Sequence, residues 1–345
     1  MRLVSYVNNG GEALGLLVGD SVYPVNKLQT GWPRTMAELL SRWEDWRLRL
    51  SWMENRIRQE GGAAFRHIAL SDLELLSPVP QPPSCRDGYA FRQHVETARR
   101  NRGLVMIPQF DEYPVFYYTN PLTVQGPGKV RCMPDHFRQL DFELEVAIVI
   151  GRGGRNIAAA EADSYIAGLT VMNDLSARTL QLEEMLLNLG PAKGKDFATA
   201  LGPCLVTMAE LRPFETACRP GHTGISWDLE MRATVNGLEV SYGNVKDMEW
   251  TFAEIIERAS YGVTLHPGEV IGSGTVGTGC FLELNGTARV ADPDFVGQWL
   301  QPGDRIDCTI DVLGTLTNTV VPEPSGHSIL GLKKKSNLLN SPLNE

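Results

Sequence analysis

Short segments rich in apolar residues open the chain, and such segments between turn residues are typical of β-strands. Residues 2–6, 13–18 and 21–24 form three such stretches, separated by glycine-containing turns at 10–11 and 19–20. Between residues 35 and 59 the apolar positions follow a helical spacing instead, carried by Leu39, Leu40, Trp43, Trp46, Leu50 and Trp52. The pattern predicts a small N-terminal α+β domain over residues 1–76.

Four prolines between residues 77 and 84 mark the end of this unit. Proline cannot occupy the interior of a helix or of a central strand, so we interpret 77–84 as a linker into a larger domain at 85–330. Short apolar segments bounded by Gly and Pro dominate that domain. We predict strands over residues 114–118, 143–150, 168–173, 202–207, 228–235, 269–272, 280–284 and 305–313.

One helix is clearly indicated in the larger domain, over residues 176–189, with Ser176 as its N-cap and Gly190 as its stop. Many strands and few helices predict an α+β, mainly β fold, with a curled or barrel-like sheet in the larger domain. The last segment, 331–345, contains a lysine triplet and reads as a polar, solvated tail.

The composition is that of a soluble globular protein, with 43% hydrophobic and 21% charged residues in a chain of 345. A net charge of −9 argues against a nucleic-acid-binding surface. No apolar run is long enough for a membrane span or a signal peptide. The six cysteines are scattered without a Cys-x-x-Cys pair, which argues against a zinc site or a dense disulfide framework. We expect a cytoplasmic protein with reduced thiols.

The most informative segment is 140–151, which alternates acidic and apolar residues before it becomes wholly apolar. On a strand, Asp141, Glu143 and Glu145 would share one face. Carboxylates stacked beside a core strand are costly unless a cation sits there, and a hard metal ion with oxygen ligands suits them. The solvated face of an edge strand is the alternative, and the segment alone does not choose between the two.

A second candidate region begins at Asp174, where an apolar strand ends and the predicted helix starts. Arg178 and Gln181 follow at positions i and i+3 and so share a helical face. Lys195 lies in the Gly-containing segment 190–197, which can aim a charge into a cleft. The structural alternatives are a helix cap for Asp174, a surface ion pair for Arg178 and a solvated turn for 190–197.

Asp87 and His94 follow directly on the proline-rich linker, seven residues apart. That spacing is two helical turns if the segment is helical, so both side chains can face one site, although a single histidine is often structural. The basic cluster at 99–102 can receive a substrate carboxylate, or it can be a solvated helix face.

A G-x-G-x-x-G pattern at 272–277 does not predict a dinucleotide site, because a strand is expected after it and the βαβ context is missing. A turn between two strands fits better, with Thr275 in the loop and Glu283 on the following strand.

Taken together, these segments resemble the fumarylacetoacetate hydrolase family, in order from about residue 85 to 285. The family pattern is an acid-x-Glu pair, Asn-Asp-x-Ser-Ala-Arg, Gly-Lys-x-Phe and a Gly-Thr turn, found here at 143–145, 173–178, 194–197 and 274–275. The resemblance implies a catalytic domain of that family's curled-sheet type. It also implies a metal site with four ligands, Asp87, Glu143, Glu145 and Asp174.

Within the family the chain resembles fumarylacetoacetase more than the acylpyruvate hydrolase and oxaloacetate decarboxylase branch. Its Asp87–His94 spacing and Glu283 match the former, and Thr97 stands where the latter carries a glutamate. The resemblance implies that His94 is a general base held by Glu283. The implied oxyanion donors are Lys195, Gln181 and Arg178, and the implied substrate-binding residues are Tyr89, Tyr117, Arg102 and Thr275.

Two positions depart from the pattern. Met185 replaces a site tyrosine, and the register leaves open whether Arg100 or Arg102 corresponds to the family's substrate-binding arginine.

The implied reaction is hydrolysis of a carbon–carbon bond in a 1,3-dicarbonyl acid such as fumarylacetoacetate, as in aromatic amino acid catabolism. One Mg²⁺ or Ca²⁺ per subunit would stabilise the enolate. A 2-oxo acid decarboxylase, isomerase or acylpyruvate hydrolase of the same superfamily shares this chemistry and stays open. A metal-binding protein without catalysis is the alternative of another class. We expect a small keto acid substrate, a homodimer, and no nucleic-acid or membrane partner.

Overall fold

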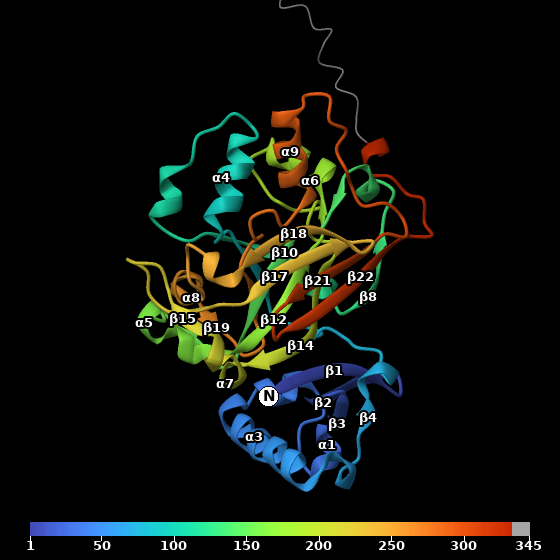
Figure 1. The fold of residues 1–345 in the computed structure, drawn as a ribbon, viewed down its shortest axis with the longest axis vertical. Coiled ribbons are helices and arrows are strands. Elements are labelled where there is room, and N and C mark those ends of the chain that lie inside the picture. The colour runs from blue at the N-terminus through green and yellow to red at the C-terminus, as the bar shows by residue number, and fades with distance from the viewer. Residues whose placement is uncertain (333–345) are drawn as a thin grey trace, which may run out of the picture.

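One large sheet runs from the N-terminal strands into the centre of the molecule (Figure 1). The computed structural model describes residues 1–332. In spatial order the strands of this sheet are β4 (Ile68–Ala69), β3 (Ser21–Pro24), β2 (Gly11–Val18), β1 (Arg2–Asn8), β14 (Thr199–Thr207), β12 (Ile166–Asp174), β10 (Leu144–Ile150), β20 (Val270–Gly272), β5 (Cys85–Gly88) and β6 (Phe116–Thr119), with β7 (Val124–Gln125) beside β14.

The N-terminal strands join this sheet because β1 pairs with β14, with Leu3 opposite Leu205. Strands from both sides of the proline-rich segment therefore belong to one sheet, and the boundary at 77–84 stays a prediction. A second sheet lies against β12 and β14. Its strands, in order, are β18 (Leu238–Asn244), β17 (Glu230–Val235), β21 (Arg305–Ile310), β22 (Gly314–Pro322) and β8 (Gly128–Cys132).

Three strand pairs complete the β-structure of the described residues. They are β9 (Leu140–Asp141) with β13 (Ser176–Ala177), β11 (Gly154–Arg155) with β19 (Thr264–Leu265), and β15 (Glu215–Ala217) with β16 (Ile225–Trp227).

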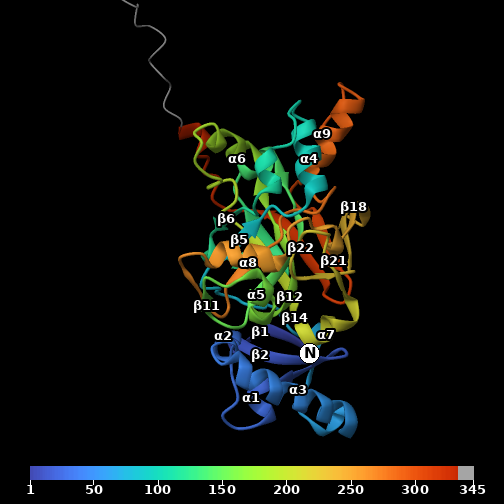
Figure 2. The same ribbon diagram turned by 90° about the vertical axis from the view of Figure 1, so that its left-hand side faces the viewer.

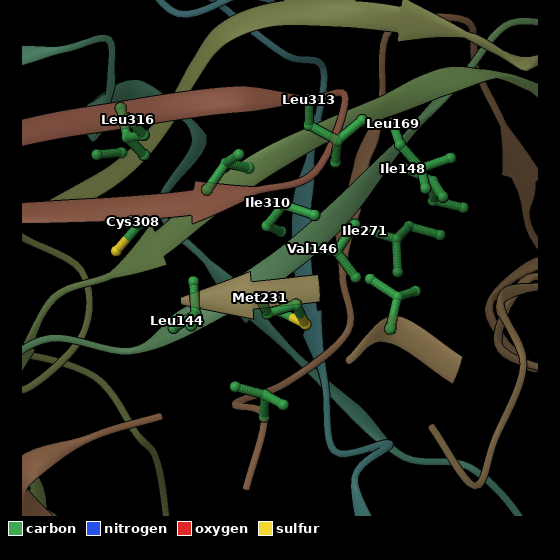
Figure 3. Close-up of a cluster of buried hydrophobic side chains, with 14 of the residues drawn as sticks. Leu144, Val146, Ile148, Leu169, Met231, Ile271, Cys308, Ile310, Leu313 and Leu316 are labelled. Atoms are coloured by element: carbon green, nitrogen blue, oxygen red, sulfur yellow. The ribbon is translucent and has the colours of Figure 1, made fainter. Parts of the chain in front are cut away.

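The central strand β10 is apolar throughout its second half because both of its faces are buried. Val146 and Ile148 belong to a core shared with Met231 and Ile310 of the second sheet (Figure 3). Val149, on the opposite face, packs in a separate core together with residues of the N-terminal helices. This double burial explains the long apolar run that the sequence shows after Glu145.

The N-terminal helices are α1 (Val25–Leu28), α2 (Met36–Leu40) and α3 (Trp43–Glu60). The single helix predicted for 35–59 is thus divided. Thr35 caps α2 by accepting the Glu38 N–H, and the Ser41 hydroxyl donates to the Glu38 carbonyl at its end. Arg42 has a non-helical backbone, with φ −137°, and α3 begins after it.

The larger domain carries helices α4 (Arg92–Arg100), α5 (Ala159–Ala162), α6 (Arg178–Met185), α7 (Met208–Leu211), α8 (Phe252–Ser260) and α9 (Phe281–Ala291). In both views α4, α6 and α9 lie at the end of the molecule opposite the N-terminal unit (Figures 1 and 2). Strand β5 leads into α4, and β12 leads through β13 into α6.

The strand predicted at 280–284 is wrong, because α9 occupies this segment. Asp141 explains the difference: its carboxylate accepts the N–H groups of Phe281 and Leu282, at 2.7 and 2.9 Å. A carboxylate at a helix N-terminus satisfies free N–H groups and interacts favourably with the helix dipole. This cap comes from a residue far away in the sequence, so local pattern does not reveal it.

The helix predicted over 176–189 is shorter than expected, because Ser176 and Ala177 pair with β9 before α6 begins. The Ser176 hydroxyl donates to the Asp174 carbonyl and does not cap the helix. The strand predicted at 305–313 ends at Ile310, where a turn with Val312 at φ +66° leads into β22. Several strands were not predicted, among them β5, β8, β18 and β22.

Strands nevertheless form more of the regular structure than helices do. The predicted α+β, mainly β fold class is therefore confirmed. Among the described residues, no helix combines the length and the apolar character that crossing a membrane requires. Of the predicted tail at 331–345, the described part ends within a short 3₁₀ turn, Leu330–Leu332, and positions 333–345 with the lysine triplet lie outside the described residues.

A buried histidine precedes β9. His136 lies against Phe197, with ring centroids 4.1 Å apart, and its Nδ1 accepts the Met133 N–H at 3.2 Å. Burial, reinforced by the charge of Lys193, lowers the pKa of His136 from 6.5 to about 4. His136 therefore folds as the neutral imidazole.

We expect this histidine to make folding pH-dependent. The pKa of His136 is depressed in the folded protein. The stability that its neutral ring contributes is therefore fully present above pH 6.5 and is lost as pH falls from 6.5 through about 4. Between pH 7.5 and 5 the wild type should lose roughly 2 kcal/mol more unfolding free energy than His136→Gln, in which this group does not titrate. Urea unfolding at the two pH values measures the difference, and equal losses would contradict the prediction.

Candidate metal centre and active site

Four carboxylates meet at one buried point of the large sheet. Asp87 comes from β5, Glu145 from β10 and Asp174 from the end of β12, while Glu143 lies directly before β10. All four are buried, and one oxygen of each lies within 4.8 Å of the others. The structure thus brings together the four residues that the family resemblance implies as metal ligands.

The strand between β10 and β5 leaves room for this cluster. A Cβ at Gly272 of β20 would lie 2.7 Å from an oxygen of Asp87 and 2.9 Å from one of Glu145. A side chain at this position would therefore displace the carboxylates. Gly272, the first glycine of the G-x-G-x-x-G pattern, therefore lets carboxylates approach the backbone closely, whereas in a dinucleotide site such a glycine lets a phosphate approach.

Asp141 does not join the cluster. The chain is not a continuous strand between β9 and β10, so Asp141 does not share a strand face with Glu143 and Glu145, as the alternation predicted. Its carboxylate caps α9 and also accepts from Arg178 Nε at 2.9 Å. Asp141 thereby holds Arg178 in place beside the cluster.

Two buried cations neutralise part of the cluster. Arg178 donates to Glu143 at 2.7 Å, and Lys195 Nζ donates to Asp174 at 2.6 Å and also to Glu143. Burial works against ionisation of Glu143, but the charges of Arg178 and Lys195 outweigh it and hold the pKa of Glu143 well below its usual range. Glu143 is therefore a carboxylate at neutral pH.

The other side of the cluster lacks positive charge. Asp87 and Glu145 both accept the Gly274 N–H at 3.1 Å, and the second oxygen of Glu145 is buried without a hydrogen-bond partner. Burial and the neighbouring Asp174 raise the pKa of Asp87 to about 7. Burial and the neighbouring Asp87 raise the pKa of Glu145 well above its usual range.

A divalent cation fits this side of the cluster. An unpaired buried oxygen and two carboxylates whose ionisation is suppressed are the groups that such an ion would stabilise. The all-oxygen donor set suits a hard ion such as Mg²⁺ or Ca²⁺.

A buried histidine–glutamate pair lies close to the carboxylates. His94 Nδ1 and Glu283 Oε2 are 2.6 Å apart, and Glu283 Oε1 accepts the Thr278 N–H at 3.0 Å. His94 is near enough to Glu143 for its charge to contribute to the lowered pKa of that carboxyl. The contact with Glu283 fixes the imidazole and leaves Nε2 free to act.

The structural route to this pair differs from the predicted one. Asp87 lies on β5 and His94 on α4, so their spacing is not two turns of one helix. Glu283 lies in the first turn of α9 and not on a strand. Helices α4 and α9 pack together, which brings His94 and Glu283 into contact.

Some of the remaining predicted site residues contact the carboxylate cluster or His94, and others do not. Tyr117 donates a hydrogen bond to Asp174, and the ring of Tyr89 meets that of His94 edge-on at 5.9 Å. Thr275 is buried in the loop after β20, as predicted for its loop position. Arg102 is exposed and donates to the Ala98 carbonyl at 3.0 Å.

The neighbouring positions complete this comparison. Gln181 accepts from Arg178 Nη1 at 2.9 Å, and Arg178 is 2% exposed with its donors on Gln181, Asp141 and Glu143. Arg178 therefore positions the cluster. Met185, where the family pattern has a tyrosine, is exposed at the end of α6.

Comparison with known proteins is consistent with this site. Residues 84–321 match the family described as fumarylacetoacetate (FAA) hydrolase, C-terminal. The chain is 32% identical over 256 residues to the oxaloacetate tautomerase YisK of Bacillus subtilis, covering 73% of this chain and 74% of that protein.

Two further similarities extend over more of the chain. It is 30% identical over 312 residues to the mitochondrial oxaloacetate tautomerase Fahd2a of Rattus norvegicus, covering 88% and 85%. The structure is similar to that of a fumarylacetoacetate hydrolase from Exiguobacterium antarcticum, with a TM-score of 0.64, 24% identity and coverage of 94% and 100%. The last similarity concerns the fold alone.

Proposed function

Because the chain belongs to the fumarylacetoacetate hydrolase family, we propose that it is a metal-dependent tautomerase that interconverts the enol and keto forms of a small 2-oxo dicarboxylic acid such as oxaloacetate. The observation that carries the proposal is the carboxylate cluster, which lacks a cation on one side and lies beside the His94–Glu283 pair. The names of the relatives at 30–32% identity favour this isomerase alternative over the carbon–carbon hydrolase that the motif spacing first indicated.

Asp87, Glu143, Glu145 and Asp174 would hold one divalent ion, Mg²⁺ or Ca²⁺, whose positive charge stabilises an enolate as a Lewis acid. The chain's own residues then move the proton. In the keto direction, protonated His94 would deliver its Nε2 proton to the carbon beside the carbonyl, while the enol hydroxyl proton passes to solvent and solvent reprotonates His94; the enol direction is the reverse of these steps. Glu283 stabilises the imidazolium and keeps the ring oriented.

Several side chains would bind and orient the substrate in this proposal. Lys195 and Gln181 present charge and hydrogen-bonding groups at the edge of the cluster, and Tyr89 and Tyr117 shield it from water. Thr275 and one of Arg100 and Arg102 are proposed to receive a substrate carboxylate. A homodimer is likewise proposed as the assembly.

Hydrolysis of a 1,3-dicarbonyl acid is the second candidate, because the His94–Glu283 contact also suits the activation of water. A buried carboxylate on Nδ1 stabilises the imidazolium that forms when a histidine deprotonates water. Tautomerisation and hydrolysis would use the same base and the same enolate, so they differ in whether water attacks.

One product analysis separates the candidates. We expect the Mg²⁺-loaded protein to accelerate the loss of enol absorbance from freshly dissolved oxaloacetate beyond the rate with Mg²⁺ alone, with proton NMR showing the equilibrium mixture of keto and enol forms and no cleavage product. Fumarylacetoacetate and a panel of acylpyruvates should remain intact in parallel reactions. Cleavage of these compounds into two acids would establish the hydrolase instead, and carbon dioxide release from oxaloacetate would establish a decarboxylase.

A further inference from the structure

We propose that His94, Cys280 and Glu283 form a second cation site, which binds a soft divalent transition metal such as Zn²⁺. One donor atom of each residue lies within 4.8 Å of the other two, and all three side chains are buried. Cys280 is the N-cap residue of α9, Glu283 lies in the first turn of that helix, and His94 reaches them from α4.

The donors of this site differ in kind from those of the carboxylate cluster. Imidazole nitrogen, sulfur and one carboxylate oxygen are the ligand types that Zn²⁺ uses, with three protein ligands and a fourth open position. Mg²⁺ and Ca²⁺ prefer oxygen and select against thiolate. The chain therefore places a hard-ion site and a soft-ion site side by side.

Charge balance also favours a divalent ion here. Binding breaks the Cys280 S–H bond, forms a metal–sulfur bond and releases the proton to solvent, so that thiolate and carboxylate together neutralise the ion. A site without net charge is the arrangement that a buried environment tolerates best. Burial and the neighbouring Asp141 raise the pKa of the Cys280 thiol well above its usual range, so the sulfur carries its proton until a metal ion displaces it.

The absence of a Cys-x-x-Cys pair does not exclude zinc from this site, because the site takes one thiol and joins it to a histidine far away in the sequence. Only packing of α4 on α9 creates it.

Occupancy of this site would have a functional consequence, which rests on the proposed function. A metal ion on His94 and Glu283 holds the lone pair and the carboxylate that proton transfer needs. Zn²⁺ at stoichiometric concentration is therefore expected to inhibit the Mg²⁺-loaded enzyme.

The test uses CoCl₂ as a spectroscopic probe on the full chain saturated with Mg²⁺. We expect one Co²⁺ per chain to produce a sulfur-to-cobalt charge-transfer band in the near ultraviolet. Co²⁺ that displaces Mg²⁺ from the four carboxylates gives no such band, because that cluster contains no sulfur. Absence of the band in the wild type would overturn the proposal.

Two variants locate the sulfur. Cys280→Ser should remove the band and weaken Co²⁺ binding by more than the roughly 10- to 100-fold that loss of an outer-sphere partner costs. Cys218→Ser is the matched control, because Cys218 is the half-buried thiol of the chain, and the band should persist. A band that survives in Cys280→Ser would contradict the assignment. Cys280→Ala repeats the test if the serine variant does not fold.

Inhibition is measured separately from binding. Zn²⁺ should lower wild-type turnover and leave that of Cys280→Ser unaffected. A cobalt band without any enol–keto turnover would keep the metal site and refute the proposed function. Turnover without a cobalt band would support the proposed function and refute the second metal site.

Discussion

His94→Ala is expected to lower enol–keto turnover by about 10²- to 10⁴-fold, the range typical for loss of a general acid–base group. The variant should still bind Mg²⁺ with wild-type affinity, because the four carboxylates lie on β5, β10, β12 and the segment before β10, whereas His94 lies on α4. Turnover measured by enol absorbance and Mg²⁺ affinity measured by calorimetry test both parts.

Two further variants define what the result means. His67→Ala removes an exposed histidine of the N-terminal unit and should leave turnover unchanged. Glu283→Gln keeps the hydrogen-bonding shape but removes the charge that stabilises the imidazolium, so it should lower turnover less than His94→Ala and alter the pH profile. Full activity in His94→Ala would exclude His94 as the base.

The carboxylate cluster was the part of the site most accessible from sequence. Asp174 is the last residue of a fully buried strand, and Glu145 directly precedes the apolar half of β10, so both acids lie at the ends of buried strands. Buried acids at such positions indicate a bound cation, and the order of the four motifs along the chain indicated the family. The structure adds that the pairing of β10 with β12 and β20 places them around one point.

The charge balance of the site was not accessible, because it depends on long-range partners. Asp141 was grouped with the acids by alternation, yet it serves as the cap of α9 and the anchor of Arg178. Local pattern could not show that the chain leaves the strand between Asp141 and Leu144. It also could not show that Arg178 and Lys195 converge on Glu143.

Helix α9 is a second feature that local sequence could not predict, because a distant residue stabilises it. Its first residues, Phe281 to Leu284, are apolar except for Glu283, as in a short buried strand, and Cys280 has no side-chain capping bond. The carboxylate that satisfies the N-terminal N–H groups comes from residue 141. Helix and strand compete closely in such a short segment, and the tertiary contact decides between them.

Removal of metal is expected to abolish turnover and to lower stability. At a free Mg²⁺ concentration 100 times the Kd, binding should add about 2.7 kcal/mol to the unfolding free energy of the wild type. Glu145→Gln should lose most of this gain together with turnover, because it removes a carboxylate whose free oxygen has no other partner. Urea unfolding with EDTA and with Mg²⁺, for both proteins, measures the gain.

The same variant is expected to behave in the opposite way without metal. Four buried carboxylates share two cations, Arg178 and Lys195, so removing one acid relieves repulsion, and Glu145→Gln in EDTA should be at least as stable as the wild type. Glu239→Gln, an exposed acid on β18, is the control and should change neither measurement. A Glu145→Gln protein that is less stable than the wild type in EDTA would show that Glu145 serves the fold, and the reversal between the two conditions is what identifies a cation site.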